Sequence, residues 1–540
     1  MQPGEGTAVS ELPDDVRALK SIIRGKDSFI AELEKRNEIL LEQVRLLEKY
    51  RFARSSEKWT AEDELQGRLF NEAEVGVRPM PGEVFETERI SYTRKRRKGR
   101  RALPEDLPRN TIIHELTEEQ RRCGNKGCPK WGECGKLRPL IGEETREELE
   151  FIPAQIRVNR HVYRKYGQIA CEAAAEEERV PTVISAPREK RMVRGGIATA
   201  SLLSHVVASK FADGLPLYRQ ERIFARLGIR ISRQSMCNWT IQASRGCGEY
   251  LELLWREIRA GPLINMDETT LQVLHEPDRE AQTKSYMWVM VGTGEEGRRV
   301  VLYTYCPHRN GQMAERLLEG YRGSLQTDGY EGYGSVGARK EIWHVGCLAH
   351  ARRKFYEADV AAGGKGLARE GLQYFKKLYR IERKLRGRGL PKQQFVMERR
   401  KAAAPVWRRF RRWLRSASET VVSESLLGKA VSYTLGDYRR LVRYLKYAYL
   451  TPDNNVAEQA IRPFVVGRKA WLFNNTPLGA HASAAMYSIV ETAKASNLDP
   501  FHFMYRLFSE LPKADTEEKL EKLLPWNMAG IPPYKLTREN

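Results

Sequence analysis

The stretch PLINMDETTLQVL, residues 262–274, is an apolar run with several β-branched residues, which is typical of a strand. Four more strand-like runs follow it: KSYMWVMVGTG (284–294), RRVVLYTYC (298–306), GSLQTDGY (323–330) and EIWHVGC (341–347). A helical pattern at 310–319 separates the third run from the fourth. Three successive strands, a helix and further short strands predict an α/β sheet in this part of the chain.

Helical patterns precede this block and follow it, at 186–258 and 359–450. The second region is strongly basic, because residues 376–415 contain 16 Lys and Arg against two acids, a local charge of +14. Aromatic and basic residues alternate there: Trp407, Phe410 and Trp413 with Arg408, Arg409, Arg411 and Arg412. We expect these arginines to contact phosphates, and the alternative is a solvated helix that buries its aromatic side.

A helix-turn-helix pattern lies within the first helical region, in PLYRQERIFARLGIRISRQSMCNWTIQA at 216–243. Gly228 falls at the turn, and Ser232 is suited to cap a second helix. Arg233 and Gln234 then fall in the first turn of that helix, where side chains reach base edges in DNA-binding proteins. A purely structural pair of helices is the alternative.

The composition of the chain indicates a polyanionic partner. The 540 residues include 92 Lys and Arg against 70 Asp and Glu, a net charge of +22, which favours nucleic acid as the partner. Hydrophobic residues make up 41%, so the chain can form real cores. No apolar run is long enough to span a membrane, and the start, MQPGEGTAVSELPDD, is not a secretory signal. Eight cysteines are too sparse for a disulfide scaffold, so we expect a reduced, cytosolic protein.

A heptad repeat runs through residues 15–50. Its a positions are Val16, Ile23, Ile30, Asn37 and Val44, and its d positions are Leu19, Lys26, Leu33, Leu40 and Leu47. Mostly β-branched residues at a and mostly Leu at d favour a parallel two-stranded coiled coil, in which Asn37 would fix the register. A single amphipathic helix that packs on its own chain is the alternative.

The run RKRRKGRR at 94–101 is almost wholly basic. Its first residues, Arg94, Lys95, Arg96 and Arg97, are candidates for an arm that contacts DNA phosphates, although a solvated tether has the same composition.

Four cysteines, Cys123, Cys128, Cys134 and Cys171, lie in the segment 111–185. Zinc sites usually draw four ligands from two closely spaced pairs, and neither pair is tight here. A degenerate zinc module and a metal-free β domain with ordinary thiols both fit this spacing. The alternation in FIPAQIRVNRHVYRKY at 151–166 predicts a small β element in either case.

Three acids stand where carboxylates could converge: Asp267 at the tail of the first strand-like run, Asp328 after a later strand, and Glu458 at the start of a helix. Carboxylates from two strand ends and a helix can hold two divalent cations for phosphodiester chemistry. Each acid also has a structural interpretation. Asp267 could bond the backbone amides that follow it, Asp328-Gly329 is a common hairpin dipeptide, and Glu458 has capping-box spacing from Asn455 and ion-pair spacing to Arg462.

Several longer motifs together resemble the transposases of the insertion sequence sixty-six family. They are MDET (266–269), TDGY (327–330), GCLAHARRKF (346–355), NNVAEQAIRP (454–463), GRKAWLF (467–473) and SIVETAK (488–494), in this order. The resemblance covers about residues 30–527. It implies an RNase H-like catalytic core of the DDE type, with Asp267, Asp328 and Glu458 as its three acids. It also implies a helical insertion before the third acid.

The resemblance extends to the surroundings of these acids. Cys347 to His350 match a Cys-x-x-His signature, which implies that His350, Arg352 and Arg353 lie beside the transferred phosphate; a buried thiol is the alternative for Cys347. The chain departs from the family in the zinc segment, where Trp131 replaces one expected cysteine and the last cysteine is absent. Zinc is therefore the one cofactor that the resemblance supports only weakly.

The patterns and the resemblance divide the chain into eight segments. These are a coiled-coil helix (15–50), a linker with a basic arm (51–110), a small β domain with a possible degenerate zinc module (111–185), a helix-turn-helix-like region (186–258), the first part of the RNase H-like core (259–358), a basic helical insertion (359–450), the last core helix (451–495) and a helical tail (496–540).

The resemblance implies metal-dependent DNA cleavage and transfer of a 3′-hydroxyl to target DNA, with two Mg²⁺ or Mn²⁺ ions held by the three acids. It further implies a cytoplasmic protein of the bacterial nucleoid that acts as a homodimer or higher oligomer on transposon ends and target DNA, with possible accessory proteins of the same element. Two alternatives share many of these features: an RNase H-like nuclease or resolvase that does not join DNA, and an inactive DNA-binding regulator.

Overall fold

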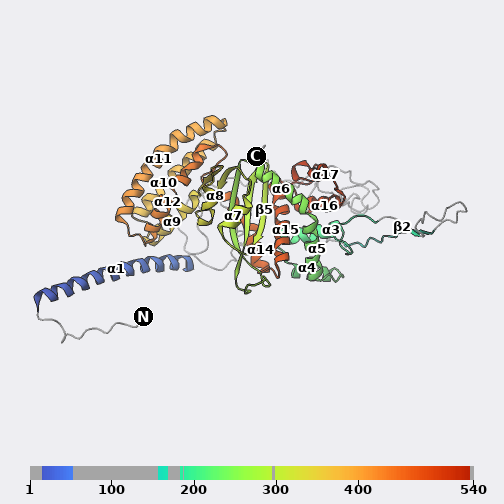
Figure 1. Ribbon diagram of the computed structural model, residues 1–540, viewed down its shortest axis with the longest axis horizontal. Helices are drawn as coiled ribbons and strands as arrows, with labels where there is room; N and C mark the ends of the chain where they lie inside the picture. Colours follow the sequence, from blue (N-terminus) through green and yellow to red (C-terminus); the bar gives the residue numbers. More distant parts are fainter. Residues whose placement is uncertain (1–14, 53–155, 168–182, 186–187, 295–297, 535–540) are drawn as a thin grey trace, which may run out of the picture. The chain divides into compact units, whose positions relative to one another are not determined.

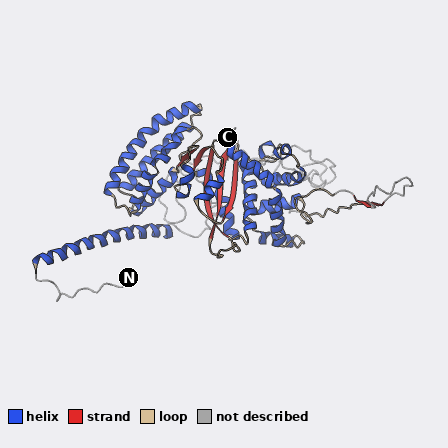
Figure 2. Ribbon diagram, viewed as in Figure 1, coloured by secondary structure: helices blue, strands red, loops and turns tan. Residues whose placement is uncertain are grey.

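The computed structural model describes residues 15–52, 156–167, 183–185, 188–294 and 298–534. Among these residues, the predicted strands form one mixed sheet. Its strands are β3 (Leu263–Gln272), β4 (Lys284–Thr293), β5 (Arg299–Cys306), β6 (Gly323–Gln326) and β7 (Ile342–Val345), in the order β5-β4-β3-β6-β7. The strands β3, β4 and β5 run antiparallel, whereas β6 and β7 run parallel to β3. The predicted α/β sheet is confirmed (Figure 2).

The sheet is central because its strands are buried on both faces. Residues Met287–Val291 of β4 are almost wholly inaccessible, and helix α7 (Gly311–Leu317) links the antiparallel part to the parallel part. Parallel strands need such a crossover connection, which explains the helical pattern predicted at 310–319.

Helix α15 (Pro477–Ala495) covers the edge strand β5 in an unusual way. The hydroxyl of Ser488 accepts a hydrogen bond from the amide of Tyr303 at 2.8 Å. The hydroxyl of Thr492 accepts one from the amide of Val301 and donates one to its carbonyl, both at 3.0 Å. An uncovered edge strand exposes backbone groups that can pair with another chain, so these side chains satisfy and protect the edge.

Four helices lie directly before the sheet in the chain, between Ala200 and Ala260: α3 (Ala200–Phe211), α4 (Leu217–Arg226), α5 (Arg233–Gly246) and α6 (Gly248–Ala260). The predicted turn between α4 and α5 is confirmed. Gly228 adopts a φ of 84°, which a glycine tolerates without strain, and the Ser232 hydroxyl caps α5 by accepting the Ser235 amide at 3.1 Å. Both Arg233 and Gln234 are exposed in the first turn of α5.

Helices also fill the chain between the last strand and the third candidate acid. They are α9 (Leu348–Ala361), α10 (Leu367–Arg386), α11 (Lys392–Thr420), α12 (Leu426–Gly436), α13 (Tyr438–Val442) and a short 3-10 helix (Arg443–Lys446). Trp407 and Phe410 are buried and belong to the core of this helical group, so they are no part of a DNA-binding surface. The arginines between them face solvent. Figure 1 shows α9–α12 gathered on one side of the sheet.

The C-terminal part is helical as well. Helix α14 (Asn455–Trp471) packs on β3 and β4, and α15 is followed by α16 (Pro500–Glu510) and α17 (Glu517–Glu521). None of the described helices has a stretch long and apolar enough to cross a bilayer.

Two segments differ from expectation or extend it. The small β element predicted from residues 151–166 is present at the end of that stretch, where β1 (Lys165–Gly167) pairs antiparallel with β2 (Val183–Ser185), whereas residues 156–164 are not in a strand. Alternation without a partner strand does not fix an extended segment in a sheet. The heptad region forms one helix, α1 (Val16–Phe52), which continues through Gly25.

Candidate active site

The register of two parallel strands places Asp267 beside Asp328. The last pair between β3 and β6 is Asn265 with Gln326, and their side chains are joined by a hydrogen bond of 3.2 Å. Asp267 and Asp328 each lie two residues further along, on the same face as this pair, because side chains alternate along a strand. Asp267 is not at the tail of its strand as predicted, since β3 continues beside β4 to Gln272.

Asp328 lies in the turn after β6. Its Oδ1 accepts the amide of Tyr330 at 3.0 Å, which fixes the carboxylate at the edge of the sheet. The hairpin interpretation of Asp328-Gly329 is wrong, because β6 and β7 are parallel. The ring of Tyr433, from α12, packs so closely on Gly329 that a side chain there would collide with its hydroxyl.

Asn454 positions the helix that carries the third acid. Its Nδ2 donates to the carbonyl of Met266 at 2.8 Å, and its Oδ1 accepts from Asn265 at the same distance. Its amide donates to Sγ of Cys347 at 3.3 Å. These bonds attach the start of helix α14 to residues 265 and 266 of β3, directly before Asp267. Glu458 lies in the first turn of α14, where the helix dipole favours a negative charge.

The carboxylate of Glu458 faces α9. Its Oε1 lies 3.6 Å from Nδ1 of His350, and its Oε2 lies 3.9 Å from Nη2 of Arg353. The predicted capping box is absent, because Asn454 rather than Asn455 is the N-cap residue and makes no side-chain cap bond. The structure records no ion pair between Glu458 and Arg462 in its described part.

The carboxyl of Asp267 is influenced by the charges of both other candidate acids. Burial and the negative charges of Glu268, Asp328 and Glu458 together raise the pKa of Asp267 to about 7, with burial as the largest cause. Burial lowers the pKa of His350, against the opposing effect of Glu458 and Asp328. Carboxylates crowded in this way repel each other, and a bound cation would relieve the repulsion.

Sequence reasoning missed Glu268, the neighbour of Asp267. Its side chain is 2% exposed, pairs with Nη2 of Arg309 at 2.6 Å and accepts a hydrogen bond from the hydroxyl of Tyr333. It thereby connects β3 to the loop after β5 and to the turn after Asp328. The paired acids of INMDETT were the available signal, but nothing in the sequence near them indicates Arg309 as a partner.

The residues at this site fit a divalent cation. The donors that lie closest together include the carboxylate of Glu458 and the imidazole of His350, and among the described residues Oε1 of Glu458 and Nδ1 of His350 are buried without any hydrogen-bond partner. Cys347, His350 and Glu458 present ligand atoms within 4.8 Å of one another. Buried polar atoms are rarely left unsatisfied, so their position here is consistent with a site for an ion.

The pKa of Asp267 leads to a prediction for metal binding. Below about pH 7 its carboxyl is mostly protonated and a cation must displace the proton, so we expect Mn²⁺ affinity to fall about fivefold from pH 7 to pH 6, more steeply below pH 6, and to level off above pH 7. Titration of Mn²⁺ binding at several pH values measures this. Asp267→Asn should bind more weakly and lose most of the dependence, whereas an equal pH profile in both proteins would contradict the prediction.

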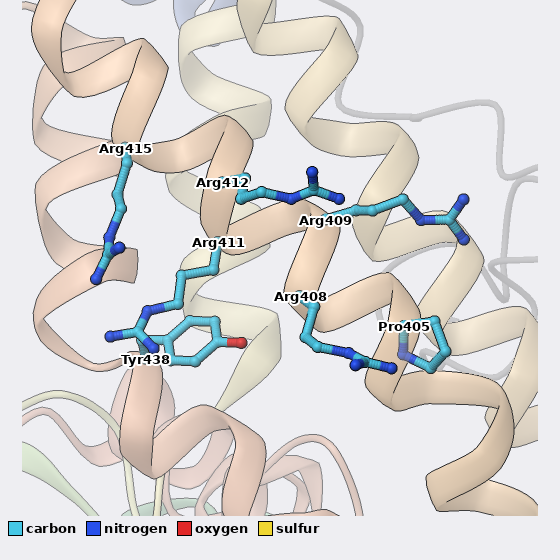
Figure 3. A pocket seen from close by; sticks show the side chains of 7 residues that line it. All are labelled: Pro405, Arg408, Arg409, Arg411, Arg412, Arg415 and Tyr438. Atoms are coloured by element: carbon cyan, nitrogen blue, oxygen red, sulfur yellow. The ribbon is translucent and has the colours of Figure 1, made fainter.

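A pocket of about 550 Å³ brings together five of the exposed arginines of the helical group. It is lined by Arg408, Arg409, Arg411, Arg412 and Arg415 with Pro405 and Tyr438 (Figure 3). The guanidinium of Arg411 lies 5.0 Å from the ring centre of Tyr438, whose hydroxyl donates to the carbonyl of Trp407 at 3.1 Å. Among the described residues, no carboxylate forms an ion pair with any of the five.

The remaining predicted site residues are either exposed on α9 or lie outside the described residues. Arg352 and Arg353 are exposed on α9 next to the acids. The basic residues 94–97 and the cysteines Cys123, Cys128, Cys134 and Cys171 lie outside the described residues.

The mixed sheet, flanked by helices and carrying acidic residues near the ends of its central strands, defines a protein of the mixed α/β class. Comparison with known proteins gives the family. Residues 195–482 match the family described as Transposase IS66 family, and this match covers more than half of the chain. The chain belongs to the IS66 transposase family, which indicates transposase function and, with it, DNA binding and the use of divalent metal.

Three further segments match models from the same family. Residues 39–112 match a model described as Transposase C of IS166 homeodomain, residues 126–172 a zinc-finger binding domain of transposase IS66, and residues 488–526 an IS66 C-terminal element. The zinc-finger match includes Cys128, Cys134 and Cys171 but begins after Cys123. Three of the four candidate zinc ligands therefore lie within the matched segment, and Cys123 lies outside it.

Similar proteins are known from Sinorhizobium fredii. Uncharacterized protein y4jD is 32% identical over 436 residues, which are 79% of this chain and 81% of that protein. Uncharacterized protein y4qI is 27% identical over 555 aligned positions, which cover 96% of this chain and 98% of that protein.

Proposed function

We propose that this transposase cleaves DNA strands at the ends of an insertion sequence and joins the 3′-hydroxyl to target DNA by DDE chemistry. The observation that carries the proposal is that Asp328, in the turn after β6, and Glu458, on α14, lie close enough to Asp267 on β3 for their charges to raise its pKa. The strand order, with three antiparallel strands followed by two parallel ones, supports an RNase H-like core.

Each residue has a distinct part in this chemistry. Asp267, whose pKa is raised by burial and by both other acids, would hold the divalent cations together with Asp328 and Glu458. When bound, the two cations activate the attacking water or 3′-hydroxyl and stabilise the leaving oxygen. Arg353, which lies 3.9 Å from Glu458, and its exposed neighbour Arg352 on α9 can hold the phosphate under attack.

The arginine pocket is the proposed contact for DNA phosphates. Five cations without acidic partners repel one another, so phosphates should bind there and release counterions. We expect Arg408→Ala with Arg412→Ala to weaken DNA binding in low salt and to reduce the slope of log affinity against log salt by about 2. Fluorescence anisotropy at several salt concentrations measures the slope.

The control removes the same charge elsewhere. Lys519 and Lys522 each pair with an acid four residues earlier in the chain. Lys519→Ala with Lys522→Ala should leave the slope unchanged. An equal change of slope in both double variants would contradict a specific role for the pocket.

The helix-turn-helix unit is a second proposed DNA contact. Met236, Trp239 and Ala243 bury one face of α5, which leaves Arg233 and Gln234 on the free face with Asn238. Gln234 donates to the amide oxygen of Asn238 at 3.0 Å, so the two side chains are already oriented together. Such a pair of amides on a capped helix suits contacts with base edges in a major groove.

Self-association through α1 is proposed from the exposed seam. Ile30, Leu33, Leu40, Val44 and Leu47 are 45–66% exposed, and Asn37 lies in the same seam. A second copy of α1 is the occupant that the heptad favours. We expect Leu40→Asp to convert a dimer into a monomer at micromolar concentration in analytical ultracentrifugation. Ala31→Asp, outside the seam, should remain a dimer; loss of the dimer in both variants, or in neither, would contradict this interface.

Strand transfer is the result that tests the proposed function. Labelled transposon-end DNA is incubated with the protein, Mg²⁺ and target plasmid, and the products are separated on a denaturing gel. Nicked ends that become joined to the plasmid support a transposase. Nicks without joined products indicate the nuclease or resolvase, and binding without any cleavage indicates the inactive regulator.

A further inference from the structure

His350, on α9, faces the third candidate acid, Glu458, and has the chemistry of a metal ligand. His350 and Glu458 each have one buried polar atom without a hydrogen-bond partner among the described residues, and these two atoms face each other. The other carboxylate oxygen of Glu458 is turned toward Arg353, 3.9 Å away. These two atoms without a partner therefore lie at one point between α9 and α14, where a single ligand could satisfy both.

The distance between the two atoms selects what fits there. Nδ1 of His350 and Oε1 of Glu458 are 3.6 Å apart, which is too far for a direct hydrogen bond. Two metal bonds of about 2.1 Å can span up to about 4.2 Å, so one ion reaches both atoms. The unprotonated nitrogen of a neutral imidazole and a carboxylate oxygen are both ordinary metal ligands.

Cys347 is close but is already satisfied. Its sulfur lies within 4.8 Å of the other two ligand atoms, yet it is wholly buried and accepts the amide of Asn454 at 3.3 Å. That bond holds the start of α14, so the thiol has a structural partner that neither His350 nor Glu458 has.

We propose that His350 and Glu458 bind the same divalent cation, so that this cation has a mixed nitrogen and oxygen environment. The inference rests on the proposed metal site, and it makes His350 a ligand of the ion rather than a contact to the phosphate. Imidazole nitrogen favours transition-metal ions over Mg²⁺. A cation held by His350 and Glu458 would therefore be Mn²⁺ in preference to Mg²⁺. A cation held by Asp267 and Asp328 would have only carboxylate oxygens from the protein.

Electron paramagnetic resonance of the full-length protein with Mn²⁺ alone tests the assignment. The hyperfine coupling of a directly bound ¹⁴N reports the imidazole independently of activity. We expect this coupling in the wild type and its loss in His350→Ala, with Mn²⁺ binding at this position weakened at least tenfold.

Two further variants sharpen the experiment. His350→Asp places a carboxylate oxygen where Nδ1 lies, because both atoms are bonded to Cγ. This variant should still bind the ion, without nitrogen coupling and with its preference shifted from Mn²⁺ toward Mg²⁺. His308→Gln removes an exposed histidine that is not part of the group Cys347, His350 and Glu458, and it should keep the coupling.

The outcomes separate this inference from the proposed function. Bound Mn²⁺ without nitrogen coupling in the wild type, or coupling that persists in His350→Ala, overturns His350 as a ligand and leaves the role of the three acids intact. Absence of bound Mn²⁺ in the wild type overturns the inference together with the metal site itself.

Discussion

Asp328→Asn is expected to abolish both nicking and strand transfer by this protein, by about a thousandfold or more. The amide has nearly the shape of the carboxylate, so it can still accept the amide of Tyr330 that now bonds to Oδ1. It loses the charge that binds a cation, and metal ions contribute several kcal/mol to the stabilisation of such a transition state. Rates of nicking and joining of labelled end DNA in Mg²⁺ measure the loss.

Two controls accompany this variant. Glu331→Gln removes an exposed carboxylate three residues further along and should retain normal rates. The DNA affinity of Asp328→Asn should equal or exceed that of the wild type, since a negative charge has been removed from the site. Normal nicking and joining by Asp328→Asn would exclude the DDE mechanism for this chain.

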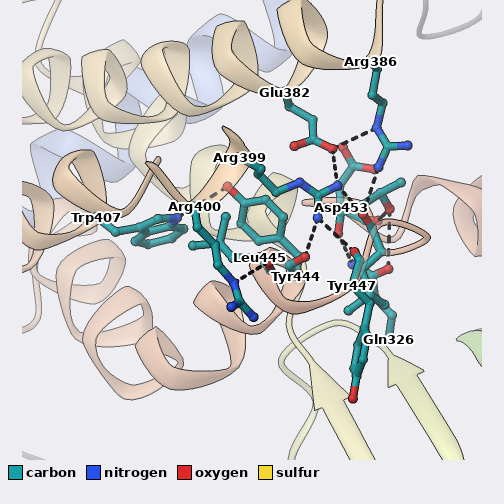
Figure 4. A network of polar contacts seen from close by, with 12 residues as sticks. Gln326, Glu382, Arg386, Arg399, Arg400, Trp407, Tyr444, Leu445, Tyr447 and Asp453 are labelled. Atoms are coloured by element: carbon teal, nitrogen blue, oxygen red, sulfur yellow. Dashed lines mark hydrogen bonds and ion pairs between the residues drawn. The ribbon is translucent and has the colours of Figure 1, made fainter. Parts of the chain in front are cut away.

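Arg399→Met is expected to cause the largest loss of stability. Arg399 is fully buried in α11, where its guanidinium donates to Glu382 at 2.9 Å and to the carbonyls of Tyr444, Tyr447 and Leu450 at 2.6–3.1 Å (Figure 4). Its removal leaves three backbone carbonyls without this donor and Glu382 with Arg386, at 2.8 Å, as its remaining ion-pair partner, and breaking a buried ion pair costs about 3–5 kcal/mol. We expect the thermal unfolding midpoint of this part of the chain to fall by about 10 °C.

The neighbouring residue provides the control for this prediction. Arg400 is exposed and makes a single hydrogen bond, of 3.3 Å, to the carbonyl of Leu445. Arg400→Met should shift the midpoint by no more than about 2 °C. If Arg399→Met unfolds within the same margin of the wild type, the buried network does not stabilise the helical group.

The same network bears on the active site. The carbonyls that Arg399 binds belong to the chain that leads from the helical group to Asn454 and Glu458. A little further along, Gln326 donates to the carbonyl of Thr451 at 2.8 Å, which ties this chain to the sheet. The helical group therefore positions the third acid, in addition to carrying the arginine pocket.

The predictions from sequence were strongest where the signal is local. The five strands, the helix after the third strand and the turn at Gly228 with its cap at Ser232 follow from periodicity and turn chemistry, and they are confirmed. The small β element expected from 151–166 is present only as the short pair β1–β2, because the partner strand β2 is short and pairs with three residues of β1.

Local patterns also misled at the acids. Asp328-Gly329 has the composition of a hairpin turn, but the strands on either side of it are parallel. Asn455 and Glu458 have capping-box spacing, yet the helix begins one residue earlier and Glu458 faces α9 instead. In each case contacts between distant segments decide the conformation, and spacing within a few residues carries no information about them.

The sequence by itself determined the family motifs, the strands and helices of the core, and which three acids to compare, because residue type and period are properties of short segments. Only the tertiary structure decided that these acids meet. The parallel register of β3 with β6 and the hydrogen bonds of Asn454 join segments 61 to 189 residues apart, and those bonds form only once the chain has folded. The unsatisfied pair of His350 and Glu458 arises in the same way, since burial and distance are properties of the packed molecule.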